Sequence, residues 1–480
     1  MKPILFRYLC FALFFLTACS KPKMNDTPDA SPPTTPKSNE KAITFFVLKA
    51  TDNTGFVADD TAILSYNDTL ILTVPYGIDI TSLKPTITYM GSAIEPNSGV
   101  IQNFTNPVRY VITAENGTLK NYVVKVKVKI GSTVYAASES GKLYALDGET
   151  GTLKWIYSTT GTIKNASPTF YNGTVYIGSS DSYMYAIDAK TGLLKWKFSS
   201  KGSLEYSTPT VNNGILYFGG IVTLYNQGAL YAVDALTGNL LWSYLDYERV
   251  NNPTAINGKI FTTTFNGLFS VDEQTGLYSV GYDGSICRAN PLVINQVIYA
   301  GTETTVLSAF DIKTGVNIWK YHDTSTDGFF VSGTFCSPTS HNGTIFGGGA
   351  IQYMYAIDSA TGKLKWRSLN YGTFSSPVVA NGNVYAGNSD YFYALDENTG
   401  LMKWQFYCGS SSLPHFRAEN IGTVKEDIVY LGSYNKIHAL DAFTGAIKWQ
   451  YITNESVLGG PCVVTEDNKV YNSGLSGEHQ

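Results

Sequence analysis

The strongest constraint on the fold is a segment of thirteen residues that recurs along the chain. Its first copy, LYALDGETGTLKW, covers residues 143–155, and its second, MYAIDAKTGLLKW, covers residues 184–196. Six further copies begin at Leu230, Leu268, Leu307, Met354, Phe392 and Ile437. The central aspartates of successive copies lie between 38 and 47 residues apart. A period of about forty residues with short alternating apolar runs predicts a β-propeller, in which each repeat supplies one blade of four strands.

The chemistry of the segment predicts a tight hairpin with a docking side chain. Two alternating strands flank Asp-x-x-Thr-Gly, where the Asp carboxylate can accept backbone N–H bonds two residues on and Gly can close the turn in the left-handed region. The Trp then projects from the outgoing strand to pack between blades. The complete docking pairs are Asp147 and Trp155, Asp188 and Trp196, Asp234 and Trp242, Asp311 and Trp319, Asp358 and Trp366, Asp396 and Trp404, and Asp441 and Trp449. The fourth copy has Val280 instead of Trp, which predicts a weaker contact there.

The pattern Ala-x-Asp-x-x-Thr-Gly-x-x-x-Trp resembles the docking motif of the PQQ-like (quinoprotein-type) β-propellers. The resemblance covers roughly residues 131–474 and implies an all-β propeller. It does not assign a function, because that family contains both cofactor enzymes and cofactor-free scaffolds.

Eight copies predict eight blades, with seven as the alternative. A second hairpin, often turning at Asn-Gly, precedes each docking hairpin. The first copy lacks the opening strand of this hairpin, whereas residues 460–464 form a surplus strand at the other end. We therefore expect the C-terminal strand to complete the first blade and close the ring. Residues 470–472 resemble one more strand, for which the sequence shows no place.

The remaining domains are read from composition and strand pattern. Residues 1–19 combine Lys2 and Arg7, an apolar run and a lipobox-like ending at Cys19, which predicts a lipoprotein signal peptide; an ordinary signal peptide is the alternative. Residues 20–41 are polar and rich in Pro, predicting a disordered tether. Residues 42–130 alternate as a small β-sandwich that resembles Ig-like spacer modules. Residues 131–480 form the propeller.

The loop lengths point to one face of the propeller as the binding face. The two hairpin turns of each repeat are short and uniform, whereas the other connections are long and irregular. We call the side with these long connections the irregular face. Its candidate partner-binding residues are aromatic: Tyr225, Tyr247, Phe329, Phe330, Tyr353 and Phe416. Such side chains suit a protein hot spot or the apolar face of a sugar ring.

Cofactor chemistry finds little support in the sequence. The quinoprotein dehydrogenases that the motif resembles often carry adjacent cysteines and a Trp over the quinone. Here Cys287, Cys336, Cys408 and Cys462 are well separated, and every Trp belongs to a docking position. The histidines show no metal-ligand spacing. We therefore expect no catalytic residue, no metal and no PQQ. The disulfide state of the four cysteines stays open.

The sequence as a whole predicts a non-catalytic, membrane-anchored binding or scaffold lipoprotein. A formal charge of −4 and a pI near 5.8 predict no nucleic-acid partner. The expected partners are the membrane, through the lipid anchor, and a protein, in the manner of outer-membrane assembly lipoproteins, or a glycan. The expected location is the outer membrane of a Gram-negative bacterium, facing the periplasm or the surface. The alternative function is a PQQ-dependent dehydrogenase.

Overall fold

The computed structural model is built of β-strands. It describes residues 36–56, 58–65, 68–222, 227–246, 250–264, 267–282, 290–301, 307–323, 336–348, 353–368, 375–388, 390–409 and 422–472. The strands of this part number 41. The same residues contain no helix long and apolar enough to cross a membrane. The chain divides into two compact units, residues 1–74 with 78–127, and residues 75–77 with 128–480.

The smaller unit contains two antiparallel sheets. The three-stranded sheet has the order β2 (Asp60–Thr61), β1 (Ala42–Leu48), β5 (Pro85–Met90). The five-stranded sheet has the order β3 (Ile63–Ser65), β4 (Thr69–Val74), β8 (Leu119–Val128), β7 (Val108–Thr113), β6 (Ala93–Glu95). Alternate residues of β4 are buried, and Phe46 of β1 meets Tyr110 of β7 edge to face at 5.5 Å between ring centroids. The two sheets therefore share one core.

The larger unit is the predicted propeller, which confirms the all-β fold class. Seven four-stranded sheets follow the chain order. They are β12 (Thr169–Tyr171), β13 (Thr174–Gly178), β14 (Tyr183–Asp188), β15 (Leu194–Ser199); β16 (Thr210–Asn212), β17 (Ile215–Val222), β18 (Gln227–Asp234), β19 (Leu240–Asp246); β20 (Thr254–Ile256), β21 (Lys259–Thr264), β22 (Gly267–Asp272), β23 (Tyr278–Tyr282); β24 (Leu292–Ile294), β25 (Val297–Ala300), β26 (Leu307–Asp311), β27 (Asn317–Tyr321); β28 (Thr339–His341), β29 (Thr344–Gly348), β30 (Met354–Asp358), β31 (Leu364–Arg367); β32 (Val378–Ala380), β33 (Asn383–Gly387), β34 (Tyr391–Asp396), β35 (Met402–Tyr407); and β36 (Gly422–Lys425), β37 (Ile428–Gly432), β38 (Lys436–Asp441), β39 (Ile447–Ile452).

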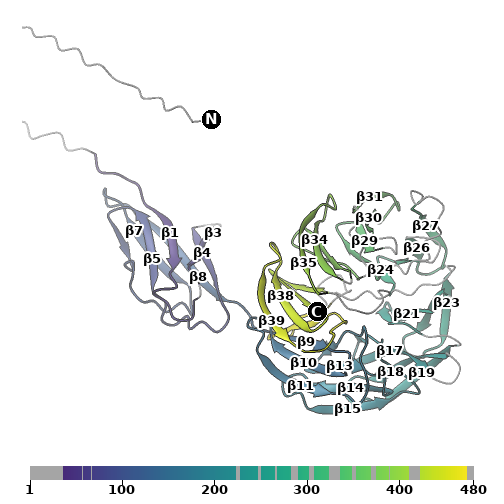
Figure 1. Cartoon of the computed structure of the whole chain (residues 1–480). Helices are drawn as coiled ribbons and strands as arrows, with labels where there is room; N and C mark the ends of the chain where they lie inside the picture. Colours follow the sequence, from purple (N-terminus) through teal and green to yellow (C-terminus); the bar gives the residue numbers. More distant parts are fainter. Residues whose placement is uncertain are drawn as a thin grey trace, which may run out of the picture. The chain divides into compact units, whose positions relative to one another are not determined.

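One further sheet of this unit joins the two ends of the repeat region. Its order is β11 (Leu153–Ser158), β10 (Lys142–Asp147), β9 (Ser132–Ala137), β40 (Cys462–Thr465), β41 (Val470–Asn472). Strand β40 pairs antiparallel with β9, placing Cys462 opposite Tyr135 and Val463 opposite Val134. Among the described residues there are thus eight propeller sheets, one for each docking segment, arranged as a ring in Figure 1. The C-terminal strand supplies the missing strand of the first blade.

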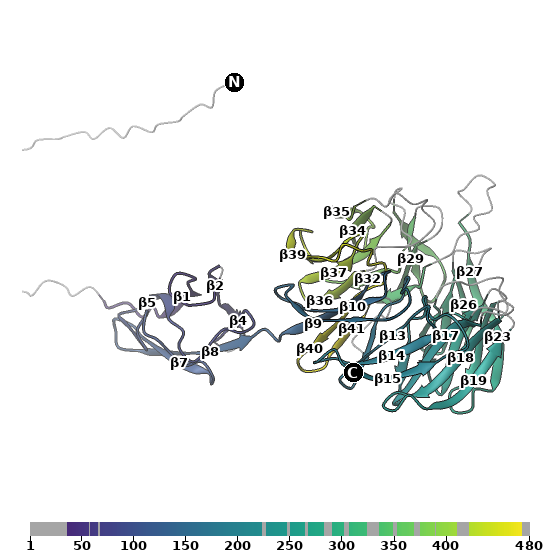
Figure 2. The same ribbon diagram turned by 60° about the horizontal axis from the view of Figure 1, so that its bottom comes forward.

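The strand that the sequence could not place, β41, forms a fifth strand on β40. Its register sets Val470 opposite Val464 and Tyr471 opposite Val463. Strand β41 also contacts β36, the first strand of the preceding sheet, and β12 contacts both β16 and β40. Because these opening strands contact one another around the ring, they are the inner strands of their blades. The extra strand therefore lies on the inner side of the first blade, which Figure 2 shows beside β9 and β36.

Candidate functional site

The uniform face of the propeller is built from the Asp-x-x-Thr-Gly turns. In the second copy, Asp188 Oδ1 accepts hydrogen bonds from the backbone N–H groups of Lys190 and Thr191 at 3.2 and 2.9 Å, and from the Thr191 hydroxyl at 2.8 Å. Gly192 closes the turn at a φ of +74°. The hydrogen bonds from Thr191 hold the pKa of Asp188 below its usual value. This carboxylate is occupied by its own turn and is therefore a structural group.

Each Trp of the chain joins its blade to the next one. The indole Nε1–H of Trp155 donates to the carbonyl oxygen of Ala189 at 3.0 Å, directly after Asp188 in the neighbouring sheet. All seven indoles make this bond, at 2.8 to 3.2 Å. The indole ring also lies under the turn glycine of that sheet. A Cβ added at Gly192 would stand 2.7 Å from Trp155, so this glycine serves both the turn and the docking.

The fourth copy, which lacks the Trp, uses a different donor. Val280 occupies the position, and a Cβ on Gly315 of the next sheet would lie 3.3 Å from it, so less of the junction is filled. The hydroxyl of Tyr282, two residues further along β23, donates to the carbonyl oxygen of Ile312 at 2.9 Å. This carbonyl is the one that a Trp would otherwise bind. The weaker contact expected here is therefore offset in part by a residue that the motif does not include.

Neighbouring blades also share an aromatic contact that the docking motif did not predict. The aromatic residue two positions after the docking position meets the aromatic residue that precedes the motif alanine in the next blade, with ring centroids 5.0 to 5.9 Å apart. The pairs are Tyr157 and Tyr185, Phe198 and Tyr231, Tyr244 and Phe269, Tyr321 and Tyr355, Phe406 and His438, and Tyr451 and Tyr144. The available signal was the recurrence of aromatic residues at both positions of the repeat.

Only one of the six predicted binding residues belongs to the part of the chain that the structure describes. Tyr225, Tyr247, Phe329, Phe330 and Phe416 lie outside the described residues, as does Cys19. Tyr353 is described and lies between β29 and β30, on a connection of the irregular face. Its ring is half-buried, 6.2 Å from that of Tyr355, and the Arg367 guanidinium lies 4.9 Å from its centroid. Tyr353 therefore belongs to a packed cluster of aromatic and charged side chains.

Asp323 holds this cluster together. Its carboxylate accepts two hydrogen bonds from Arg367 Nη1, at 2.9 and 3.1 Å, and one from the Tyr355 hydroxyl at 2.8 Å. Burial and the hydrogen bond to Asp323 raise the pKa of Tyr355, and the same carboxylate raises the pKa of Arg367. The side chain of Asp323 is 7% exposed, whereas that of Arg367 is 33% exposed. The acid is therefore buried, and it fixes a cation that solvent and a partner can reach.

A similar arrangement occurs where the first and second blades meet. Asp181 accepts a hydrogen bond from the Tyr185 hydroxyl at 2.6 Å, and Lys197 lies 4.1 Å from the ring centroid of Tyr183. Burial raises the pKa of Asp181, but hydrogen bonds from Thr160 and Tyr185 outweigh it, so the pKa lies below its usual value. Lys197 and Arg367 both directly follow a docking Trp. The repeat thus presents a cation over a tyrosine ring at two separate junctions of the irregular face.

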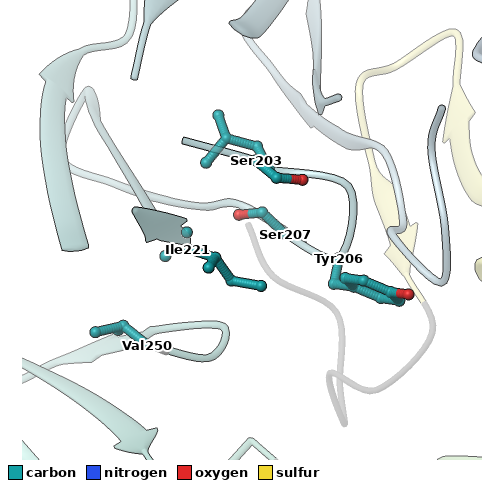
Figure 3. Close-up of a pocket in the computed structure, with 8 residues that line it drawn as sticks. Ser203, Tyr206, Ser207, Ile221 and Val250 are labelled. Carbon is teal, nitrogen blue, oxygen red and sulfur yellow. The ribbon is translucent and has the colours of Figure 1, made fainter. Parts of the chain in front are cut away.

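A small hollow lies on the same face, between the second and third blades (Figure 3). It encloses about 190 Å³ of space open to solvent and is lined by Ser203, Leu204, Tyr206, Ser207, Gly219, Gly220, Ile221 and Val250. Figure 3 shows Ser207 between Ser203 and Ile221, with Val250 on the far side. Ser207 is 3% exposed, and its hydroxyl has no hydrogen-bond partner among the residues that the structure describes. Sites that bury a drug-sized ligand are deep clefts, whereas part of this space is open solvent. A water molecule or one small polar group fits it best.

The titratable groups of the described part include no grouping suited to a metal ion. No cluster of three His, Cys, Asp or Glu side chains that could hold a metal occurs among these residues. Burial and nearby Lys436 lower the pKa of His438 to about 4, so this ring is neutral at pH 7. Cys336, Cys408 and Cys462 are free thiols whose pKa values burial raises. Cys287 lies outside the described residues.

Comparison with known proteins identifies relatives of both units. Residues 123–321 and 330–478 match the family model described as outer membrane protein assembly factor BamB. Residues 43–126 match the model described as SGBP, N-terminal. A curated relative is the dehydrogenase subunit of alcohol dehydrogenase (quinone) from Gluconobacter oxydans (strain 621H), 29% identical over 118 residues. That match covers 21% of this chain and only 16% of the relative.

Two solved structures share the propeller fold. The computationally designed Ika8 protein is 17% identical, with a TM-score of 0.53 over 67% of this chain and 93% of that one. Quinohemoprotein alcohol dehydrogenase from Comamonas testosteroni is 15% identical, with a TM-score of 0.51 over 65% of this chain and 70% of that one. At such identities the likeness shows the fold alone. The family match, in contrast, covers well over half of the sequence, and the chain belongs to the family described as outer membrane protein assembly factor BamB.

Proposed function

We propose that this chain is a non-catalytic, membrane-anchored binding protein whose irregular propeller face engages a protein partner. The observation that carries the proposal is the cluster of Tyr353 and Arg367, held in place by Asp323. Tyr and Arg are the residue types that most often dominate the energy of a protein interface. A cation fixed in advance by a buried acid loses little conformational freedom on binding. The partner that suits this cluster carries a carboxylate or backbone carbonyl groups for Arg367.

A protein partner suits the cluster better than a glycan does. A sugar ring binds by stacking on a free aromatic face, but the guanidinium of Arg367 lies over Tyr353 and Lys197 lies over Tyr183. Each ring therefore has one face already covered by a cation. The family match to an outer membrane protein assembly factor also supports a role in assembly at that membrane.

The positions of the Trp rings argue against a quinone site of the dehydrogenase type. Each of the seven Trp rings lies in a junction between blades, with its N–H bonded to a carbonyl oxygen of the next sheet. None of these rings can stack on a quinone without opening a junction. The alternative, a PQQ-dependent dehydrogenase, is tested by calorimetric titration with PQQ and Ca²⁺, where tight stoichiometric binding would overturn the proposal.

The binding proposal is tested by cross-linking the full chain to its neighbours in isolated outer membranes. The Tyr353→Ala variant should lose a specific cross-linked product that the wild type forms. Lys365→Ala is the matched control, because Lys365 lies two residues before Arg367 on β31 and pairs with Asp358 of the uniform face at 3.7 Å. This control should keep the product. Equal products from both variants would contradict the assignment of the irregular face.

The membrane anchor is proposed from Cys19 alone. The Cys19→Ala variant should leave the membrane fraction, because a lipidated cysteine would be the attachment point. Sedimentation of the variant with membranes at the wild-type level would remove the anchor from the proposal while leaving the binding face untouched.

A further inference from the structure

An ion pair between a lysine and the turn aspartate recurs at the outer edges of the blades. In five of the docking hairpins, a lysine directly before the Trp binds Oδ2 of the turn aspartate at 3.1 to 3.7 Å: Lys154, Lys195, Lys365, Lys403 and Lys448. Each of these lysines lies on the outermost strand of its sheet. A lysine on an edge strand opposes the addition of another strand, because the incoming backbone would have to bury its charge. These five blades are therefore protected against strand addition.

The third blade lacks this ion pair. Leu241 stands where those five blades have lysine, as Ser279 and Ile318 do in the fourth and fifth blades, and the outer hairpin, residues 227–246, contains neither Lys nor Arg. Asp234 Oδ1 accepts the backbone and hydroxyl bonds of Thr237, both at 2.7 Å, as in the other turns. Among the residues that the structure describes, however, no ion pair reaches this carboxylate. The cation that five other blades supply from within is missing here.

The same edge is long and apolar. Strand β19 has seven residues and is the longest outermost strand of the eight sheets described, and Figure 2 shows it at the outside of the ring. It pairs with β18 on one side, and none of the described strands pairs with the alternate backbone groups on its other side. Leu240, Leu241 and Leu245 are 50%, 51% and 56% exposed, and Leu236 in the turn is 75% exposed. We call β19 with these four leucines the apolar edge.

The next blade continues the apolar surface, but a lysine from an inner strand reaches its edge. Leu277 and Tyr278 are 69% and 56% exposed beside β23, and residues 267–282 again contain no Lys or Arg. Lys259 of β21 donates to Ser279 of β23, so its ammonium group reaches the outermost strand of that blade. The fifth blade has Lys320 on its outermost strand, β27. Among the eight outermost strands described, only β19 and β23 therefore carry no Lys or Arg, and Lys259 reaches β23.

The geometry points to strand addition: an extended segment of a partner protein, with alternating apolar and basic side chains, pairs with β19 as a fifth strand. Backbone hydrogen bonds would give the affinity, the leucines would cover the apolar side chains, and a lysine or arginine of the partner would supply the cation that Asp234 lacks. An anionic lipid surface does not suit this edge, because its charged groups are the carboxylates of the hairpin. The apolar edge is separate from the irregular face, so it adds a second binding surface to the proposed function.

The experiment measures binding of a capped synthetic peptide that alternates valine and lysine to the full chain, by fluorescence anisotropy. The Leu241→Lys variant places a lysine where five other blades have one. It should weaken binding by about tenfold or more, which corresponds to about 1.4 kcal/mol. The matched control is Leu401→Lys, which adds the same charge at a residue 64% exposed in a blade that already has Lys403. This control should bind as the wild type does. Melting curves check that both variants fold.

Two peptide controls separate strand addition from simple apolar contact. The peptide with glutamate in place of lysine, and the valine–lysine peptide with N-methyl groups on the edge-facing amides, should both bind far more weakly. Equal binding of either peptide, or unchanged binding to Leu241→Lys, would overturn the inference. So would a concentration-dependent dimer of the wild type that Leu241→Lys abolishes, because a second copy would then be the occupant. Binding to phosphatidylglycerol vesicles that Leu241→Lys abolishes would assign the edge to lipid and would overturn it as well.

Discussion

The indole N–H of Trp449 donates a 2.8 Å hydrogen bond to the carbonyl oxygen of Gly148, although 301 positions separate the two residues. Tyr430 donates to the same carbonyl at 3.1 Å, and Lys425, with its side chain 2% exposed, pairs with Glu149 at 3.3 Å. The last blade therefore docks onto the first with the contacts that join other neighbours, reinforced by a buried ion pair. The ring is closed twice, by these contacts and by the pairing of β40 with β9.

Removal of the closing strands should destabilise the propeller. A chain that ends before residue 459 loses β40 and β41, leaving β9 with an unpaired edge and uncovering Val134 and Tyr135, which are at most 3% exposed. We expect the melting temperature to fall by more than about 10 °C, because several buried side chains lose their cover at once. Differential scanning calorimetry checks this, with a chain that ends after residue 472 as the control. An unchanged melting temperature would mean that another segment closes the ring.

A pair of glycine variants isolates the docking of the Trp rings. Gly173 and Gly192 have φ values of +72° and +74°, so alanine suffers the same backbone strain at either position. A Cβ at Gly173 meets nothing within 4 Å, whereas a Cβ at Gly192 would stand 2.7 Å from Trp155. We expect Gly173→Ala to cost about 1 kcal/mol and Gly192→Ala about 1–3 kcal/mol more in the free energy of unfolding. Chemical denaturation measures both. Equal costs would show that the ring moves aside freely.

Two tyrosine variants test the hydrogen bond that Tyr282 supplies in the fourth blade. The Tyr282→Phe change removes the hydroxyl that donates to the Ile312 carbonyl, in the blade where Val280 replaces Trp. The Tyr135→Phe change removes a similar donor to the Ala189 carbonyl, which still receives the bond from Trp155. We expect Tyr282→Phe to be the more destabilising by about 1 kcal/mol, because it leaves a buried carbonyl without that donor. The reverse order in denaturation experiments would contradict this account of the fourth junction.

The buried His438 predicts a loss of stability in mild acid. Its pKa in the folded protein is about 4, against a usual value of 6.5, chiefly because burial disfavours the charged ring. As the pH falls from 6.5 toward 4, the unfolded chain binds a proton that the folded chain does not, so folding stability falls, by about 3 kcal/mol at most. In His438→Phe, which keeps the ring contact with Phe406, that part of the pH dependence should disappear. Urea denaturation at several pH values tests this; equal slopes for variant and wild type would contradict it.

The repeat pattern alone predicted the propeller, because its signals are local. The bond from Thr191 to Asp188 closes within three residues, and the φ of Gly192 is a property of one residue, so any chain with this motif can form the turn. Alternation within each half of the motif likewise determines which side chains face a neighbouring blade. The surplus strand at residues 460–464 was visible as well, because the first copy lacked a partner for it.

Only the tertiary structure decided which distant residues meet. Asp323 and Arg367 lie in different repeats, and nothing in either repeat shows that a buried carboxylate fixes that cation. Strand β41 has the sequence of an ordinary strand, but it pairs on the inner side of β40 because the ring is already complete there. The sequence shows Leu241 in place of a lysine, and the sheet order makes its strand an outer edge. Local hydrogen bonding and periodicity are encoded residue by residue, whereas burial and charge pairing depend on which strands the closed ring brings side by side.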